Sequence, residues 1–150
     1  MAARDRRGPP PPSDPEAGIF EGRPVARRFL SPNGFVVLVG RTAADNDDLS
    51  LRLAAPQDFW LHVAGESGSH VVVRNPDRVP RLPRETLRFA ASLAAAHSKA
   101  RRGGRVAVHV TRAGEVRKPR GLPDGKVEIR EFDTVFATPW KAEDDPAAKG

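Results

Sequence analysis

Asp58-Phe59-Trp60-Leu61-His62-Val63-Ala64-Gly65-Glu66-Ser67-Gly68-Ser69-His70-Val71 is the most informative stretch of the sequence. It reads as two short β-type runs, residues 59–63 and 69–74, joined by a turn that contains glycine and serine. This pattern is typical of a β-hairpin. One of the two tryptophans and two of the four histidines fall in it, so the same stretch is the first place to look for functional chemistry.

The two faces of the hairpin differ in character because successive side chains of a strand alternate. The first run turns apolar side chains toward the core and presents Asp58, Trp60 and His62 on the opposite face. In the second run His70 falls on the face of Val72. If the runs are cross-strand neighbours, His70 lies near His62, although a slip of one residue would undo this pairing.

The rest of the chain predicts further strands around this hairpin. Val25 to Leu30 and residues 35–39 flank the turn sequence Ser31-Pro32-Asn33-Gly34, and residues 49–53, 105–111, 126–130 and 134–137 complete the set. Residues 40–48 fit a loop or the first turn of a short helix, and residues 111–125 form a long connection.

Arg84 to Arg101 reads as a helix that Pro83 begins and Gly103-Gly104 ends. Its apolar stripe is mostly alanine, which predicts a helix lying close to the sheet: Leu87, Ala90, Ala91, Ala94 and Ala95. The predicted fold is α/β (α+β), with a mixed, mostly antiparallel sheet of six or seven strands packed against one main alanine-rich helix.

Composition sets the domain boundaries. Residues 1–22 are rich in proline, glycine and charge and predict a disordered leader. Residues 23–139 form one domain, and residues 140–150 a disordered tail. The chain has no cysteine, which excludes disulfides and thiolate chemistry, and its start lacks the apolar run of a secretion signal or membrane anchor. A cytoplasmic protein without membrane partners is the simplest interpretation.

Positive charge is concentrated in the second half of the chain. The whole sequence carries a net charge of +6, with pI near 10.7. Residues 31–73 hold two basic and five acidic side chains, a net of −3, whereas residues 74–130 hold fifteen and five, a net of +10. The basic half is therefore a candidate surface for a polyanionic partner.

Several segments together resemble the NFACT-R domain, also called DUF814. These are Gly40-Arg41 with Asp45-Asn46-Asp47, Asp58 to Val63, Gly68 to Val71, Ala90-Ala91 with Ser98-Lys99-Ala100-Arg101, and the loop at Arg117-Lys118-Pro119. The resemblance runs from about Val25 to Pro139. That family forms the C-terminal module of ribosome-associated quality-control factors, some once labelled fibronectin-binding, and the chain is interpreted as a stand-alone copy.

The resemblance implies an RNA-binding module without intrinsic catalysis and without a cofactor, whose partner is tRNA or rRNA in a ribosome-associated setting. The large ribosomal subunit and a separately encoded NFACT protein are the further partners considered. Two alternatives stay open: a small histidine-dependent enzyme acting on RNA or nucleotides, and a basic module that docks on a ribosomal protein.

The candidate site has two parts. Basic side chains of the expected helix end and of the long connection are predicted to hold phosphates: Lys99, Arg101, Arg102, Arg105, Arg117, Lys118 and Arg120. A pocket is predicted to face a base or ribose, lined by Asp58, Trp60, His62, Ser69 and His70. Alternatives for these residues are that Trp60 is core, that the histidines make structural hydrogen bonds or bind metal, or that Ser69 acts as a nucleophile with His62 or His70 as base.

Overall fold

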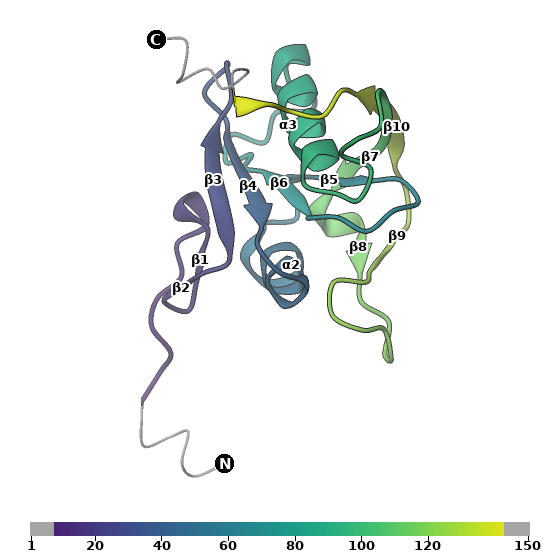
Figure 1. The fold of residues 1–150 in the computed structure, drawn as a ribbon. Coiled ribbons are helices and arrows are strands. Elements are labelled where there is room, and N and C mark those ends of the chain that lie inside the picture. Colours follow the sequence, from purple (N-terminus) through teal and green to yellow (C-terminus); the bar gives the residue numbers. More distant parts are fainter. Residues whose placement is uncertain (1–7, 143–150) are drawn as a thin grey trace.

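A six-stranded antiparallel sheet forms the centre of the molecule in the computed structural model, which describes residues 8–142 (Figure 1). The strands follow the order β10 (Asp133–Ala137), β7 (Val106–Arg112), β5 (Phe59–Val63), β6 (Val71–Val73), β4 (Val36–Gly40) and β3 (Ala26–Leu30). Each neighbouring pair is antiparallel. The α+β class and the sheet are therefore confirmed, and no parallel pair occurs among these six strands.

The predicted hairpin occupies the middle of the sheet. In β5 and β6, Trp60 lies opposite Val72 and Leu61 opposite Val71. On its other edge β5 pairs with β7, which places His62 directly opposite His109. Because β5 and β6 both have partners on each side, their main-chain hydrogen-bonding groups are paired within the sheet. Their apolar side chains are also buried on both faces, because helical segments pack on each.

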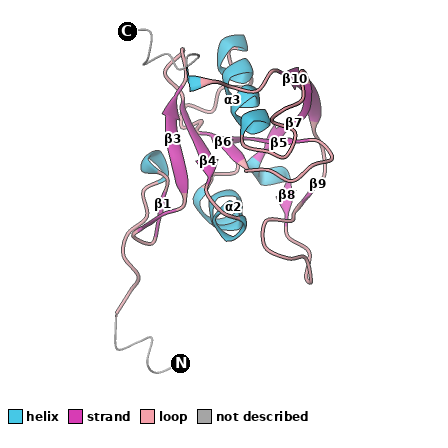
Figure 2. Ribbon diagram, in the orientation of Figure 1, coloured by secondary structure: helices cyan, strands magenta, loops and turns pink. Residues whose placement is uncertain are grey.

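Helices cover the two faces of the sheet, as the cyan elements of Figure 2 show. Helix α3 (Arg84–Ala96) packs on one face through Phe89, Leu93 and the predicted alanine stripe, of which Ala90, Ala91, Ala94 and Ala95 are buried. The second face buries Leu38, Trp60 and Val72 against Leu49 and Leu53. Small side chains leave little bulk between α3 and the sheet, which agrees with the predicted close packing.

Helix α3 ends at Ala96, five residues before the predicted end. The His97 main-chain N–H donates to the Leu93 carbonyl at 3.0 Å, and the chain then leaves the helix. Residues 97–99 instead pair with residues 67–69 of the hairpin loop. Those tertiary hydrogen bonds outweigh the helix propensity of the alanine- and arginine-rich sequence.

Residues 43–53 are helical, which corrects the prediction of a strand at residues 49–53. Helix α2 (Ala43–Asp48) begins at Thr42, whose hydroxyl accepts a hydrogen bond from the Asp45 N–H at 3.1 Å, and a π-helical turn (Leu49–Leu53) continues it. A leucine at every second position also puts leucines four residues apart, so Leu49 and Leu53 face the sheet from one side of a helix. An alternating apolar pattern over only five residues therefore did not distinguish a strand from a helix.

Residues 14–24 have defined structure, which corrects the predicted disordered leader over residues 14–22. A 3₁₀ turn (Pro15–Ala17) precedes the hairpin of β1 (Ile19–Phe20) and β2 (Arg23–Pro24). Glu16 accepts a hydrogen bond from Nε of Arg74 at 2.9 Å. Main-chain hydrogen bonds and ion pairs hold this segment in place. Such contacts produce no periodic pattern of apolar residues, so the sequence did not predict that the segment is ordered.

The connection after β7 also contains regular structure. β8 (Val116–Arg117) and β9 (Glu128–Ile129) pair with each other outside the main sheet, so the strand predicted at residues 126–130 is short and has a local partner. Trp140 donates its main-chain N–H to the Ser92 carbonyl at 2.9 Å. Residues 143–150 of the predicted tail, and 1–7 of the leader, lie outside the described residues. Within residues 8–142, no helix has the length and apolar character that crossing a membrane requires.

Candidate functional site

A pocket of about 690 Å³ opens on the face of the sheet that carries α2. Trp60 and His62 of β5, His70 before β6 and His109 of β7 line it, together with the loops at residues 65–68 and 124–127. The ring centroids of His62 and His70 are 5.5 Å apart, and that of Trp60 lies 5.9 Å and 5.1 Å from them. The predicted grouping of these three side chains on one side of the sheet is confirmed, and Lys99 also lines the pocket.

His70 is the most buried of the three histidines, with 1% of its surface exposed, and both of its ring nitrogens have partners. Nε2 of His70 lies 3.1 Å from the Gly125 carbonyl, which only accepts, so in the neutral ring Nε2 carries the proton and donates it there. Nδ1 then accepts the proton of the Ser50 hydroxyl at 2.7 Å, and that hydroxyl accepts a hydrogen bond from Nε1 of Trp60 at 2.9 Å. One neutral tautomer satisfies this whole chain of hydrogen bonds.

Burial keeps the histidines uncharged. Burial first, and the neighbouring His62 second, lower the pKa of His70 to about 4. Burial also lowers the pKa of His62 and of His109 below the ordinary value of 6.5. Near pH 7 the three rings therefore act as flat, neutral hydrogen-bonding surfaces and not as cations.

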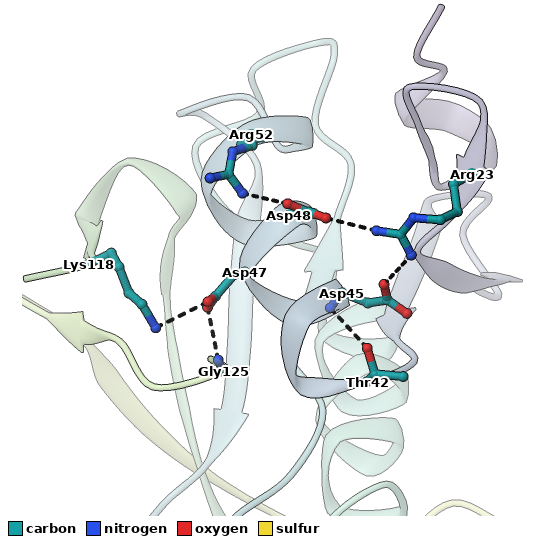
Figure 3. A network of polar contacts seen from close by, with 8 residues as sticks. All are labelled: Arg23, Thr42, Asp45, Asp47, Asp48, Arg52, Lys118 and Gly125. Atoms are coloured by element: carbon teal, nitrogen blue, oxygen red, sulfur yellow. Dashed lines mark hydrogen bonds and ion pairs between the residues drawn. The ribbon is translucent and has the colours of Figure 1, made fainter. Parts of the chain in front are cut away.

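Helix α2 holds the loop that forms the opposite wall of the pocket. Figure 3 shows the contacts of Asp47 in α2 with Gly125 and Lys118. The Asp47 carboxylate accepts a hydrogen bond from the Gly125 N–H at 3.1 Å and pairs with the Lys118 ammonium group at 3.1 Å. Lys118 also donates to the Lys126 carbonyl at 2.7 Å. Its predicted role as a phosphate contact is therefore corrected: this ammonium group is engaged in positioning the loop.

On its other side α2 is held by two arginines. Arg23 pairs with Asp45 at 2.6 Å and with Asp48 at 2.9 Å, and Arg52 also pairs with Asp48 (Figure 3). The acidic run within residues 40–48, predicted as a loop or a first helical turn, is thus an anchor between the N-terminal hairpin, α2 and the pocket loop.

A shallower groove of about 390 Å³ adjoins the pocket. Its charged side chains are all basic, namely Arg41, Lys99 and Arg101, and no acidic side chain of the described chain lines it. Five residues line both hollows, so the two lie side by side: Ala43, Asn46, Ser67, Gly68 and Lys99. Phosphate oxygens suit such a lining because three positive groups come together without a competing carboxylate.

Close packing at Gly68 builds this groove. The Lys99 N–H donates to the Ser67 carbonyl at 2.9 Å, and the Ser69 N–H donates to the His97 carbonyl at 2.8 Å. A Cβ on Gly68 would lie 2.7 Å from the Cβ of Ser98. Glycine is therefore required where the two segments meet, and the pairing fixes Lys99 at the junction of the groove and the pocket.

Two predicted pocket residues have other roles. Asp58 is fully buried and away from the pocket, and its carboxylate accepts hydrogen bonds from Arg74 and from the main-chain N–H groups of Ala55 and Asn75. Its prediction as a base contact is wrong, because burial and these three donors make it a structural anchor. Ser69 lines the groove instead, and its hydroxyl donates to the Gly40 carbonyl at 2.8 Å.

The hypothesised pair of Ser69 as nucleophile and His70 as base is not arranged for catalysis. The Ser69 proton is donated to a carbonyl, and both ring nitrogens of His70 are occupied. Trp60 is 2% exposed, so it forms the floor of the pocket and not a free stacking platform. Across residues 8–142, no group of three or more histidine, aspartate or glutamate side chains is arranged to hold a metal ion.

The remaining predicted phosphate contacts divide into two sets. Lys99 and Arg101 lie in the groove, but the other four are exposed and line neither hollow: Arg102, Arg105, Arg117 and Arg120. The Arg105 guanidinium lies 5.4 Å from the ring centre of Phe136, toward the β10 edge. Their part in RNA binding stays a prediction.

Sequence reasoning missed several lining residues. Arg41 follows the exit of β4, Asn46 lies in α2, and Lys126 lies in the loop before β9. His109 of β7 was also not among the predicted site residues, although it lines the pocket. Its position opposite His62 follows from the pairing of β5 with β7, which strand alternation alone does not reveal.

A family model and two related proteins match most or part of this chain. Residues 26–131 match the model of a family described as the NFACT protein RNA binding domain. The Rqc2 homolog RqcH of Bacillus subtilis is 39% identical over 118 residues, which cover 77% of this chain and 20% of that protein. The NEMF homolog of Drosophila melanogaster, a ribosome quality control complex subunit, is 32% identical over 72 residues, which cover 48% of this chain and 7% of that protein.

The fold has a counterpart among solved structures. The C-terminal part of the fibronectin/fibrinogen-binding protein from Streptococcus suis superposes with a TM-score of 0.74 at 33% identity. The match covers 79% of this chain and 47% of that one. The chain spans about one fifth of the length of the RqcH proteins it matches.

Proposed function

Because the chain belongs to the NFACT RNA-binding domain family, we propose that it binds RNA in a ribosome-associated setting. The observation that carries this proposal is the groove of Arg41, Lys99 and Arg101, which gathers three cations without a carboxylate beside a pocket of aromatic rings. Cations in fixed positions suit the phosphate backbone, and flat rings suit bases.

The lining of the groove supports binding without catalysis. Arg41 and Arg101 are exposed and belong to different segments, so each is able to reach a separate phosphate of one strand. Lys99 stands between them and the pocket. The hypothesised pair of Ser69 and His70 is engaged in the fold, since both side chains donate to carbonyls.

We infer further that the RNA is tRNA or rRNA, and that the chain works in the cytoplasm on the large ribosomal subunit. The support is the similarity to RqcH, a homolog of Rqc2, and to the NEMF homolog, whose name makes it a subunit of the ribosome quality control complex. This chain corresponds to one part of those longer proteins. A separately encoded NFACT protein is a partner consistent with that relation.

Sedimentation with purified large ribosomal subunits tests the proposal, with an unmodified tRNA transcript and an rRNA fragment as competitors. The expected result is that the protein pellets with the subunits and that one of the RNAs releases it. The double variant Arg41→Ala/Arg101→Ala is expected to remain in the supernatant. If neither RNA releases the protein and the variant still pellets, docking is through protein and the RNA-binding assignment fails.

A further inference from the structure

The pocket beside the groove has walls of different chemistry. On the sheet side the rings of His62 and His109 lie on neighbouring strands, with Trp60 behind them. On the loop side the half-buried side chains of Val127 and Ile129 face the space. A volume of about 690 Å³ falls within the range of sites that enclose small organic groups, about 300 to 1,000 Å³. Rings facing aliphatic side chains suit a planar heterocycle.

Charges at the pocket differ from those of the groove. Lys99 and Lys126 line it, but so do Glu66 and Asp124, so its charged side chains balance. A terminal phosphate with two negative charges gains little there, whereas the acid-free groove favours phosphate. The two carboxylates are also able to accept hydrogen bonds from the exocyclic amino groups of bases. The pocket therefore fits an uncharged nucleoside, and the groove fits the phosphates that flank it.

We propose that the pocket takes one unpaired nucleoside of the bound RNA while the adjacent phosphates lie along Arg41, Lys99 and Arg101. This inference rests on the RNA binding proposed above and adds a preference for a nucleotide outside a duplex. A base inside an A-form helix is stacked between its neighbours, so it cannot enter a pocket enclosed by two loops. Lys99 lines both hollows and marks the point where the strand passes from one to the other.

The loop wall is held in place by the fold. The contacts of Asp47 with Gly125 and Lys118, and of His70 with the Gly125 carbonyl, fix this wall before any ligand binds. A preformed slot avoids part of the ordering cost of binding. Asp47 and His70 thus shape the pocket, because their contacts with Gly125 set the width between loop and sheet.

The test compares two fluorescein-labelled RNA hairpins that differ only by one bulged adenosine, by anisotropy at a single salt concentration. Wild-type protein is expected to bind the bulged hairpin about tenfold more tightly than the paired one. His62→Ala is expected to remove that preference and leave binding of the paired hairpin unchanged. Arg88→Ala, on the exposed face of α3 and outside both hollows, is the control variant and is expected to keep the wild-type preference.

A second measurement uses wild-type protein, so that the proposal is tested even if the His62→Ala variant folds poorly. The imidazole C–H signals of His62 and His109 are expected to shift in NMR spectra when the bulged hairpin is added, and to stay in place with the paired one. Equal affinity for the two hairpins, with unmoved histidine signals, overturns the nucleoside pocket while RNA binding stands. Failure to bind either hairpin overturns the proposed function and this inference together.

Discussion

Lowering the pH from 7.5 to 5.5 is expected to destabilise the fold by about 1 kcal/mol through His70 alone. The unfolded chain protonates this histidine near its ordinary pKa of 6.5, whereas the folded protein holds the pKa at about 4. The stability that comes from the neutral ring is thus fully present above pH 6.5. It is lost as the pH falls from 6.5 toward 4, because protons bind the unfolded state first.

The full loss across that window is about 3 kcal/mol, from a pKa difference of roughly 2.5 and about 1.36 kcal/mol for each pKa unit. At pH 5.5 the unfolded histidine is already mostly protonated, while carboxylates with pKa values near 4 still carry charge. The change in stability between pH 7.5 and 5.5 therefore reports mainly the protonation of histidine and not that of carboxylates. His62 and His109, whose pKa values burial also lowers, add to the loss in the same direction.

Urea denaturation at a series of pH values measures this effect. With a slope of about 2 kcal/mol per molar urea, the midpoint is expected to fall by roughly 0.5 M or more between pH 7.5 and 5.5. His70→Asn serves as the comparison: its stability is lower throughout, but its pH dependence is smaller by about 1 kcal/mol. A midpoint that stays constant, or a His70 NMR titration centred near pH 6.5, would refute the buried relay.

Further substitutions test the anchors of the site. Asp58→Asn is expected to cost about 3 kcal/mol in urea denaturation, because Arg74 loses a buried partner and an amide N–H faces main-chain donors. Gly68→Ala is expected to cost about 1 to 3 kcal/mol, because its Cβ overlaps Ser98, and hydrogen exchange should rise at Lys99. Trp60→Phe is expected to cost about 1 kcal/mol in thermal unfolding, because the donor to the Ser50–His70 chain is removed.

Alternation and turn residues predicted most of the sheet. Trp60 and His62 could be placed on one face because the strand period is two, and the Ser31 to Gly34 turn fixed the pairing of its neighbours. The prediction of a strand at Leu49–Leu53 was wrong because alternating leucines over five residues are also compatible with a helix. The signal in the sequence was Thr42, the N-terminal capping residue of the preceding helix α2.

The site was predictable only where its residues lie close in sequence. His62 and His70 share one hairpin, so local pairing brought them together. Arg41 and Lys126 reach the same region through contacts of α2 and of the loop before β9, which depend on the complete fold. The roles of Asp58 and Lys118 were misjudged because a charged side chain in a sequence does not reveal whether its partner is protein or ligand.

The salt dependence of RNA binding tests the central claim most directly. The slope of log affinity against log salt for a single-stranded RNA is measured by anisotropy for wild type, for Arg41→Ala/Arg101→Ala, and for Arg84→Ala/Arg88→Ala on α3 as control. The groove variant is expected to lose about 1.4 from the steepness of the slope, about 0.7 for each phosphate contact removed, while the control keeps the wild-type slope. A groove variant with the wild-type slope, or a control that loses as much, would contradict the assignment of RNA phosphates to this groove.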